Sequence, residues 1–338
     1  MRRTILTTVL AVLAALNASA AEDEKPIAEF YSKKTVTIAV GSSAGGNYDL
    51  YARLLGRHIG QHIPGKPVVV VQNLPGAGSR RLANVLSNVG PHDGTMLGLP
   101  NQGIAMDQAL GAEGVQFDAR KFRWIGSPIE DVNVFWAWHT NQIKSIEDAK
   151  QREFVAGATG PGSPTTFYPR IMNTVLGTKF KVVSGYPGSN ELDLAIEKGE
   201  VGGRVVGWSS LKITSDWVTT GKANVLLQFG LRKAADLPNV RLLQELAGSE
   251  KDRRIFEYLC LVPAMGRPFF MSSGTPVERA AIMRQAFDAT MKDSAFLEEA
   301  KRSKLEITPV SGDELTQIVG NMFNAPADVL AAAKAAME

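Results

Sequence analysis

A glycine-rich turn between a short β-branched segment and a helix is the part of this sequence best suited to bind a ligand. Residues 35–40 (TVTIAV) lead into Gly41–Asn47 (GSSAGGN), and a helical pattern follows from Asp49. Small residues at the start of a helix leave backbone N–H groups without partners, and the helix dipole adds positive potential there. The turn therefore favours anions and permits three chemistries: phosphate binding, nucleophilic catalysis on an acyl group, and reversible binding of a carboxylate.

Two of these chemistries lack residues that they need. The glycines of the turn have P-loop spacing, but Asn47-Tyr48 stand where a lysine and a hydroxyl residue would hold phosphate and magnesium. The turn also matches the G-x-S-x-G elbow of esterases, with Ser43 as nucleophile. In those esterases the histidine base comes after the serine and the acid, late in the chain, whereas the last histidine here, His139, lies in the first half of the 338 residues. We expect no catalytic residue, and a serine esterase using Ser43 is the less favoured alternative.

Reversible carboxylate binding agrees with further polar loops that follow strand-like segments. Several neutral donors could together bind a carboxylate without a buried lysine, although each glycine taken singly is more often an ordinary turn residue. The donors are Ser42, Ser43, Gly45 and Gly46; Asn73, Gly76 and Gly78; Thr159, Gly162, Ser163 and Thr165; and Gly188 and Ser189.

Four larger side chains have competing interpretations. Asp49 could contact the ligand, or it could complement the helix dipole and pair with Arg53 one turn later. Arg204 could meet a second carboxylate, but we expect an exposed arginine at a strand end. Tyr186 and Trp208 could stack on an aromatic or long ligand, although core packing is the commoner role of such side chains.

The elements that must position these loops alternate between strand-like and helix-like segments. Strands are predicted at 35–40, 68–72, 95–99, 154–158, 180–184, 201–208 and 225–229, and helices at 47–62, 82–89, 167–176, 191–198 and through 279–304. Residues 124–138 form an extended stretch that we interpret as a crossing segment. The pattern predicts an α/β protein with two doubly wound lobes around a ligand cleft, lobe one from 34–133 plus 227–338 and lobe two from 134–226.

The first twenty residues have the pattern of a secretory signal peptide. A basic start precedes the apolar run 5–16 (ILTTVLAVLAAL), and Ala18-Ser19-Ala20 has the form of a cleavage site. We therefore expect residues 1–20 to be removed and the mature protein to lie in the periplasm.

Composition excludes several classes of partner and cofactor. The 338 residues are 44% hydrophobic with a formal net charge of +3, and so small a net charge gives no general electrostatic attraction to nucleic acid. The one cysteine, Cys260, lies in an apolar run, which predicts a buried and inert thiol. Metal-ligand spacings are absent from the sequence, and we expect no metal and no cofactor.

An ordered set of motifs resembles the Bug-type receptors, the TctC-like periplasmic substrate-binding proteins of tripartite tricarboxylate transporters. Residues 39–53 resemble their PxGGxxDxxAR segment, residues 71–78 (VQNLPGAG) their V-x-N-x-PGAGG segment, and residues 91–97 (PHDGTML) their PDGYTLL segment. Tyr186-Pro187-Gly188-Ser189 stands where they carry YKG or YPGG. Ser42-Ser43-Ala44 departs from the usual proline-rich approach, and Ser79-Arg80 follows Gly78.

The resemblance implies a type II periplasmic binding protein that closes two lobes on a small organic carboxylate. It implies that the two glycine loops hold the ligand, and it suggests delivery to two integral-membrane transporter subunits. We expect a monomer. With the neighbouring donors and aromatic residues, the expected ligand-binding set is Ser43, Ala44, Gly45, Gly46, Asn47, Asp49, Asn73, Gly78, Thr159, Gly160, Ser163, Thr165, Tyr186 and Trp208. A ligand-sensing periplasmic input to a histidine kinase remains an alternative, because only the partner surface would differ.

Overall fold

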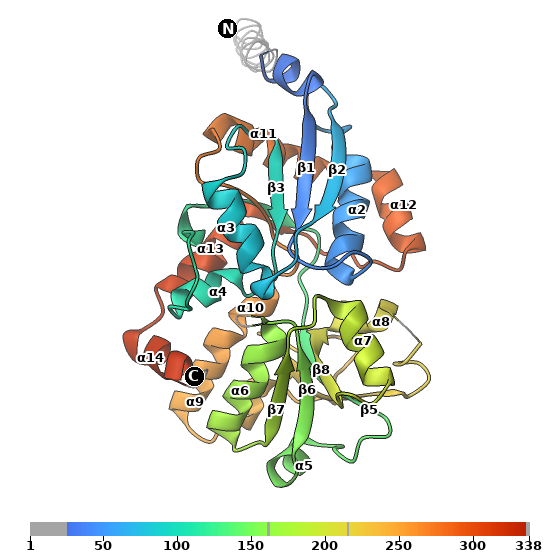
Figure 1. The fold of residues 1–338 in the computed structure, drawn as a ribbon, viewed down its shortest axis with the longest axis vertical. Helices are drawn as coiled ribbons and strands as arrows, with labels where there is room; N and C mark the ends of the chain where they lie inside the picture. Colours follow the sequence, from blue (N-terminus) through green and yellow to red (C-terminus); the bar gives the residue numbers. More distant parts are fainter. Residues whose placement is uncertain (1–25, 161–162, 215, 336–338) are drawn as a thin grey trace, which may run out of the picture.

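The protein forms two stacked α/β lobes, each built around its own sheet (Figure 1). The computed structural model describes residues 26–160, 163–214 and 216–335. The predicted signal peptide lies outside the described residues. Across the described part of the chain, no helix combines the length and apolar character needed to cross a membrane.

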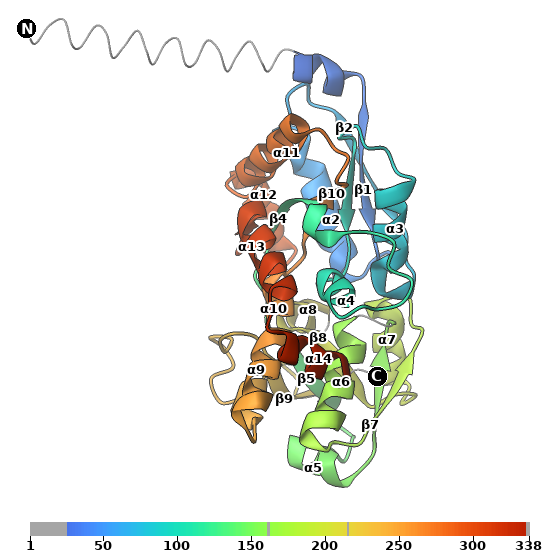
Figure 2. The same ribbon diagram turned by 90° about the vertical axis from the view of Figure 1, so that its left-hand side faces the viewer.

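The first lobe contains a six-stranded sheet of order β11-β4-β10-β3-β1-β2. Its strands are β1 (Thr35–Val40), β2 (Val68–Asn73), β3 (Met96–Leu99), β4 (Arg123–Ser127), β10 (Phe269–Met271) and β11 (Val310–Ser311). Its helices are α2 (Asn47–Ile59), η1 (Ala77–Ser79), α3 (Arg80–Asn88), α4 (Ile104–Ala109), η2 (Ala119–Lys121), α11 (Val277–Thr290), α12 (Ser294–Arg302) and α13 (Gly312–Phe323). Figure 2 shows α11, α12 and α13 along one side of this lobe and α3 along the other.

The second lobe contains a five-stranded sheet of order β7-β6-β8-β5-β9. Its strands are β5 (Asn133–Trp138), β6 (Phe154–Ala158), β7 (Phe180–Ser184), β8 (Gly203–Gly207) and β9 (Ala223–Phe229). Its helices are α5 (Ile146–Gln151), α6 (Pro164–Leu176), α7 (Ser189–Glu197), α8 (Trp208–Thr214), η3 (Leu243–Leu246) and α9 (Glu250–Leu259); α10 (Leu261–Ala264) follows at the junction of the lobes and α14 (Ala327–Ala335) ends the described chain.

Apart from β11, which is antiparallel to β4, each sheet is parallel except where the chain has just crossed from the other lobe. Strands β1, β2 and β3 run parallel, as do β6, β7 and β8, and all of these end at the cleft. β5 follows the crossing at 128–132 and β10 follows the crossing at 265–268, and each is antiparallel to both of its neighbours. A strand that enters its sheet from the cleft must run away from the cleft, which explains the reversal.

The division of the chain between lobes is less simple than one central insertion. The expected boundary between residues 226 and 227 falls inside β9, which pairs with β5 of the second sheet. Helix α14 follows α13 of the first lobe, but it packs against α9 beside the second sheet (Figure 1). Strand pairing thus favours a second lobe that continues to the end of α9, and the domain boundaries remain a proposal.

Local sequence signals explain most of the observed elements. The β-branched run of β2 pairs with β1 in register from Thr35 to Val40, and β2 forms an edge of the first sheet. The single helix expected over 279–304 is interrupted: α11 ends at Thr290, and Asp293 caps α12 by accepting from Ala295 N and Phe296 N. The Asp293 side chain offers the backbone a new helix start, which the apolar periodicity alone did not predict.

Candidate functional site

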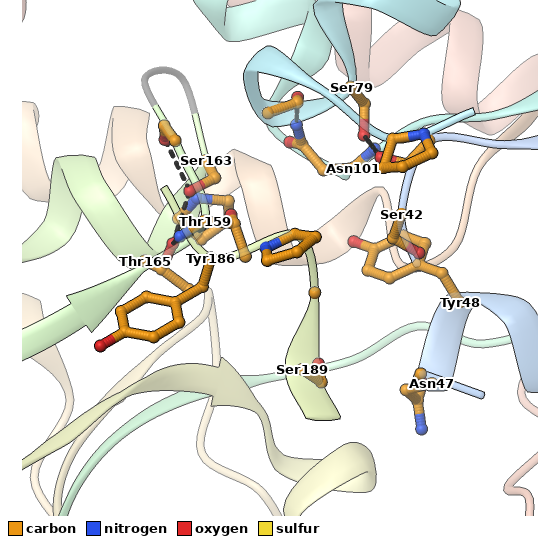
Figure 3. A pocket seen from close by; sticks show the side chains of 18 of the residues that line it. Ser42, Asn47, Tyr48, Ser79, Asn101, Thr159, Ser163, Thr165, Tyr186 and Ser189 are labelled. Carbon is orange, nitrogen blue, oxygen red and sulfur yellow. Dashed lines mark hydrogen bonds between the residues drawn. The ribbon is translucent and has the colours of Figure 1, made fainter. Parts of the chain in front are cut away.

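A cavity of about 560 Å³ lies between the lobes, at the carboxyl ends of the parallel strands. This position is the usual ligand site of open α/β sheets. Figure 3 shows polar side chains from both lobes around it, including Ser79 and Asn101 from the first lobe and Thr159 and Ser163 from the second.

Four helices begin at the wall of this cavity, and none of the four has a side-chain cap. Residues at the first turns of α2, α6 and α7 line the cavity, as does Ser79, the residue before α3. Their N-cap residues Gly46, Ser79, Ser163 and Gly188 make no side-chain cap hydrogen bond within the described residues. A helix start without a cap leaves N–H groups available to a ligand, and its dipole favours negative charge.

Helices that begin elsewhere are of both kinds. Ser145, Ser249, Asp293 and Ser311 cap α5, α9, α12 and α13, and none of these four residues lines the cavity, whereas α4, α10 and α11 begin without a side-chain cap. A cap of this kind usually stabilises a helix by about 1 kcal/mol, so its omission at four neighbouring helix starts is a cost that ligand binding would offset. The arrangement can bind an anion through donors from both lobes.

The second-lobe part of the wall is a loop stabilised by its own hydroxyl groups. Thr165 Oγ1 accepts from Thr159 N at 3.0 Å and lies 2.5 Å from Ser163 Oγ (Figure 3). Ser163 Oγ and Thr166 Oγ1 both donate to Gly160 O, at 2.9 and 2.6 Å. These contacts fix the direction of the loop before any ligand arrives. Thr159, Gly160, Ser163 and Thr165, four expected ligand-binding residues, all line the cavity.

Hydrogen bonds to Asp49 stabilise the first-lobe loop that precedes α2. Its carboxylate accepts from Gly45 N at 2.8 Å, from Arg53 Nε at 2.8 Å and from Asn73 Nδ2 at 2.9 Å, and Asn73 Nδ2 also donates to Ser42 O. Burial opposes the charge on Asp49, but the hydrogen bonds outweigh it and lower the pKa of this carboxyl group. Asp49 and Asn73 do not line the cavity, so the pairing with Arg53 is the role that the structure shows.

Other expected residues lie at the rim, where the lobes touch. Ser43 Oγ donates to Glu191 Oε2 at 3.0 Å, and Asn190 Nδ2 donates to Ala44 O at 3.4 Å. Gly45 is exposed beside them. Ser43, Ala44 and Gly45 therefore join the two lobes but do not line the cavity, whereas the expected residues Gly46, Asn47 and Gly78 do line it.

The two aromatic residues that we expected to bind the ligand differ in their environments. Tyr186 lines the cavity and is half-buried. Trp208 is buried in the second-lobe core and donates from Nε1 to Asp236 Oδ1 at 2.7 Å, outside the cavity wall. Core packing, the commoner role of such a side chain, describes Trp208 and not Tyr186.

Two buried arginines of the wall are the main features that sequence reasoning missed or misjudged. Arg267, which had no role in the sequence interpretation, is 1% exposed and connects Asn47 of the first lobe to Ser210 of the second. The prediction that Arg204 is exposed is wrong, because Arg204 is 3% exposed and pairs with Asp193 at 2.8 Å. A lone arginine between the apolar runs 258–265 and 269–271 was the only available signal for Arg267.

Some buried polar atoms of the wall have no partner within the described residues. They are Ser42 Oγ, Asn47 Nδ2, Gln102 Oε1 and Asn133 Nδ2. Buried polar groups are nearly always hydrogen-bonded in proteins, so each of these atoms is suited to meet a ligand or water. The cavity is therefore built for a polar group as well as for an apolar body.

The residues needed for hydrolysis or a metal do not assemble here. Ser43 Oγ faces Glu191, and no histidine appears in the cavity wall formed by the described residues. His58 of α2 contacts Glu299 of α12, and His62, just after α2, contacts Asp293, the N-cap residue of α12. Across the described residues there is no cluster of three or more metal-binding side chains.

Comparison with known proteins connects this geometry to solute receptors. No family model matches the chain. The UPF0065 protein in the gbd 5′ region of Cupriavidus necator is 25% identical over 250 residues, which is 69% of this chain and 69% of that protein.

Solved structures match over most of the chain. The periplasmic binding protein BugD is 18% identical with a TM-score of 0.69 and covers 86% of this chain and 94% of its own. Rpa4515 of R. palustris, solved with adipate, is 19% identical with a TM-score of 0.69 over 89% and 97%. MatC from Rhodopseudomonas palustris, with bound malate, is 18% identical with a TM-score of 0.66 over 88% and 98%. The structural neighbours are Bug/TctC periplasmic binding proteins, and the chain has their two-lobed fold.

Proposed function

From this two-lobed fold, we propose that the protein is a periplasmic solute receptor, not an enzyme, that binds a small organic carboxylate by lobe closure. The observation that carries the proposal is the convergence of four uncapped helix starts, two from each lobe, on one cavity. Neutral donors and helix dipoles stabilise a carboxylate whose water has been excluded, because their effect grows as the local dielectric falls. Donors from both lobes make binding and closure parts of the same step.

The neighbours support the ligand class and the location. Two of them were solved with dicarboxylates, adipate and malate, and BugD is described as a periplasmic binding protein. The signal-peptide pattern of residues 1–20 agrees with the same compartment. Osmotic-shock fractionation of cells expressing the full chain should release the protein with the periplasmic fraction.

We also propose that the closed receptor delivers its ligand to two integral-membrane subunits of a tripartite tricarboxylate-type transporter. The support is the ordered set of family motifs. A transport assay in vesicles that carry the candidate membrane subunits should show uptake only when the receptor and its ligand are both present. A sensory partner is the alternative, and it predicts binding without uptake.

The binding proposal is tested by calorimetry with a panel of short- and medium-chain carboxylates that includes adipate and malate. We expect saturable one-to-one binding by at least one member. Thr165→Val should weaken it by up to about tenfold, because Thr159 N loses the acceptor that orients the loop and a neutral hydrogen bond of this kind is worth about 0.5–1.5 kcal/mol.

The matched control is Thr316→Val on α13. This hydroxyl also makes a local hydrogen bond: it donates to Gly312 O at 2.7 Å, and neither residue lines the cavity. It should leave the affinity unchanged. If no carboxylate binds and the protein instead hydrolyses esters in a reaction that Ser43→Ala abolishes, the receptor proposal is wrong.

A further inference from the structure

Among the described residues, Arg204 and Arg267 are the only charged side chains in the cavity wall. A receptor for dicarboxylates or tricarboxylates needs a cation, or an equivalent set of donors, for every carboxylate that it desolvates. The uncapped helix starts supply neutral donors, so the hydrogen bonds of these two arginines decide whether the cavity also offers a ligand a cation.

Arg267 makes four hydrogen bonds to the protein, which use four of its five N–H groups. Its Nε donates to Asn47 Oδ1 at 3.1 Å, and its Nη1 donates to Gly266 O at 3.2 Å. Its Nη2 donates to Asp131 Oδ2 at 3.0 Å and to Ser210 Oγ at 2.8 Å. No edge of the guanidinium keeps two free N–H groups side by side, so a ligand carboxylate cannot bind it in the bidentate mode.

Arg204 is neutralised in a similar way. Its Nε and Nη2 both contact Asp193 Oδ1, at 2.9 and 2.8 Å, and both side chains are buried. Its Nη1 lies 3.5 Å from Ser189 Oγ. The carboxylate of Asp193 therefore occupies the Nε and Nη2 edge of this guanidinium and not its Nη1 side, and the charges of Asp131 and Asp193 balance those of the two wall arginines.

Much of the remaining wall is apolar. Its members include Tyr48, Pro75, Ala77, Leu99, Pro164, Tyr186, Pro187, Val205 and Val206. These groups form a surface suited to a hydrocarbon body, and the volume of about 560 Å³ is within the range for ligands larger than a short dicarboxylate.

We propose that this receptor selects monocarboxylates with an apolar body and rejects ligands that carry a second carboxylate. The inference rests on the proposed carboxylate-binding function and narrows its ligand class. One carboxylate binds at the uncapped helix starts, and the apolar body fills the rest of the cavity. A second carboxylate would lose its hydration beside arginines whose charge two aspartates already balance.

The test compares pairs of ligands that differ only in the second carboxylate. Calorimetry at pH 8, above the ordinary titration range of aspartate, would use butanoate with succinate, hexanoate with adipate, octanoate with suberate, and cyclohexanecarboxylate with its 1,4-dicarboxylate. We expect the monocarboxylate of the best-binding pair to bind at least about tenfold more tightly, the factor that corresponds to about 1.4 kcal/mol.

A charge-release variant tests the cause. Asp193→Asn removes the carboxylate that neutralises Arg204, so the ratio of dicarboxylate to monocarboxylate affinity should rise about tenfold or more. Asp236→Asn is the matched control, because Asp236 contacts Trp208 and Lys212 outside the cavity wall and should leave the ratio unchanged.

The outcomes are distinct. A wild-type protein that binds the dicarboxylate of a pair more tightly than the monocarboxylate overturns the inference and leaves the receptor function standing. Unchanged preference in a folded Asp193→Asn protein overturns the role of the Arg204 pair. Failure of every member of the panel to bind argues against the proposed function itself. The wild-type comparison needs no variant, so it decides the inference even if Asp193→Asn does not fold.

Discussion

Replacing Arg267 by methionine should be among the most damaging single changes in this protein. Arg267 lies in the second crossing between lobes and Asp131 lies in the first, and their 3.0 Å contact is almost completely buried. The same guanidinium also reaches Asn47 and Ser210, so it connects both lobes and both crossings. Methionine keeps the length and apolar stem of the side chain but removes every one of these hydrogen bonds.

The magnitude follows from what the substitution leaves behind. Breaking a buried ion pair typically costs about 3–5 kcal/mol, because the remaining charge has no counterion. Asp131 would keep hydrogen bonds from Ser209 Oγ at 2.7 Å, from Ser209 N and from Val132 N, which places the cost at about 3 kcal/mol. Loss of the guanidinium stacked 4.7 Å from the ring centre of Tyr48 adds to this cost.

Urea unfolding followed by circular dichroism measures the effect, and a double-mutant cycle isolates the pair. We expect Arg267→Met and Asp131→Asn each to lower the free energy of unfolding by about 3 kcal/mol. The double variant should lose about 2–3 kcal/mol less than the sum, because neither charge is then left alone. Glu130→Gln is the control next in sequence: its contact with Arg232 is exposed, so its cost should be about 0–1 kcal/mol.

Two results would refute this reasoning. A loss below about 1 kcal/mol for Arg267→Met would mean that the contact contributes no more than a surface pair. Strict additivity in the double variant would mean that Arg267 and Asp131 stabilise the protein independently of each other.

Three further predictions concern the cleft, the first loop and the thiol. Gly160→Ala would place a Cβ 3.0 Å from Gly78 N of the opposite lobe, so it should obstruct closure and weaken ligand binding about tenfold, as measured by calorimetry. The control is Gly320→Ala inside α13, where the new Cβ meets nothing within 4 Å. It should leave the affinity unchanged and raise the free energy of unfolding by about 0.5–1 kcal/mol. Burial raises the pKa of Asp49, but its hydrogen bonds lower that pKa by more, so the pKa in the folded protein lies below the ordinary aspartate value. The contribution of Asp49 to stability is therefore complete above the ordinary aspartate pKa and is lost as pH falls through the lower folded value. Thermal melts from pH 6 down to about pH 2 should show a shallower acid decline in Asp49→Asn, and an unchanged decline would contradict the assignment. Burial raises the pKa of the Cys260 thiol to about 12, so a thiol reagent at pH 8 should label it only after denaturation, and rapid labelling of the native protein would show that the thiol is accessible.

Elements with strong local signals could be predicted from the sequence. The predicted strands 35–40, 154–158 and 180–184 coincide with β1, β6 and β7, because apolar and β-branched runs end there at glycine or polar turns. The helix expected over 279–304 was wrong in its continuity, since the cap at Asp293 outweighs the apolar periodicity on either side. Helix α14 shows the complementary limit, because its packing against α9 depends on a contact between distant parts of the chain.

The residues of the candidate site were predictable where they depend on the position of a loop at the end of a strand. They were not predictable where they depend on a side-chain contact with the opposite lobe. Thr165 and Gly46 follow strands that end at the cleft, and both line the cavity as their positions indicate. Ser43 belongs to an equally suggestive loop, yet its hydroxyl faces Glu191, a residue far away in sequence, and lies at the rim. Loop composition indicates which residues come near a cleft, but the direction of each side chain depends on the opposite lobe.

The sequence by itself determined that α2 and α7 begin without side-chain caps, because glycine stands at both N-cap positions and has no side chain to accept a hydrogen bond. At α3 and α6 the N-cap residue is a serine, a residue type that often caps helices, and only the structure shows that its hydroxyl donates to a loop carbonyl instead. Only the tertiary structure decided which charges remain available to a ligand. Asp131 and Arg267 are 136 residues apart in the chain and 3.0 Å apart in the fold. Charge pairing in a low-dielectric interior depends on distance in space, so composition could count the arginines but could not show that their charges are already balanced.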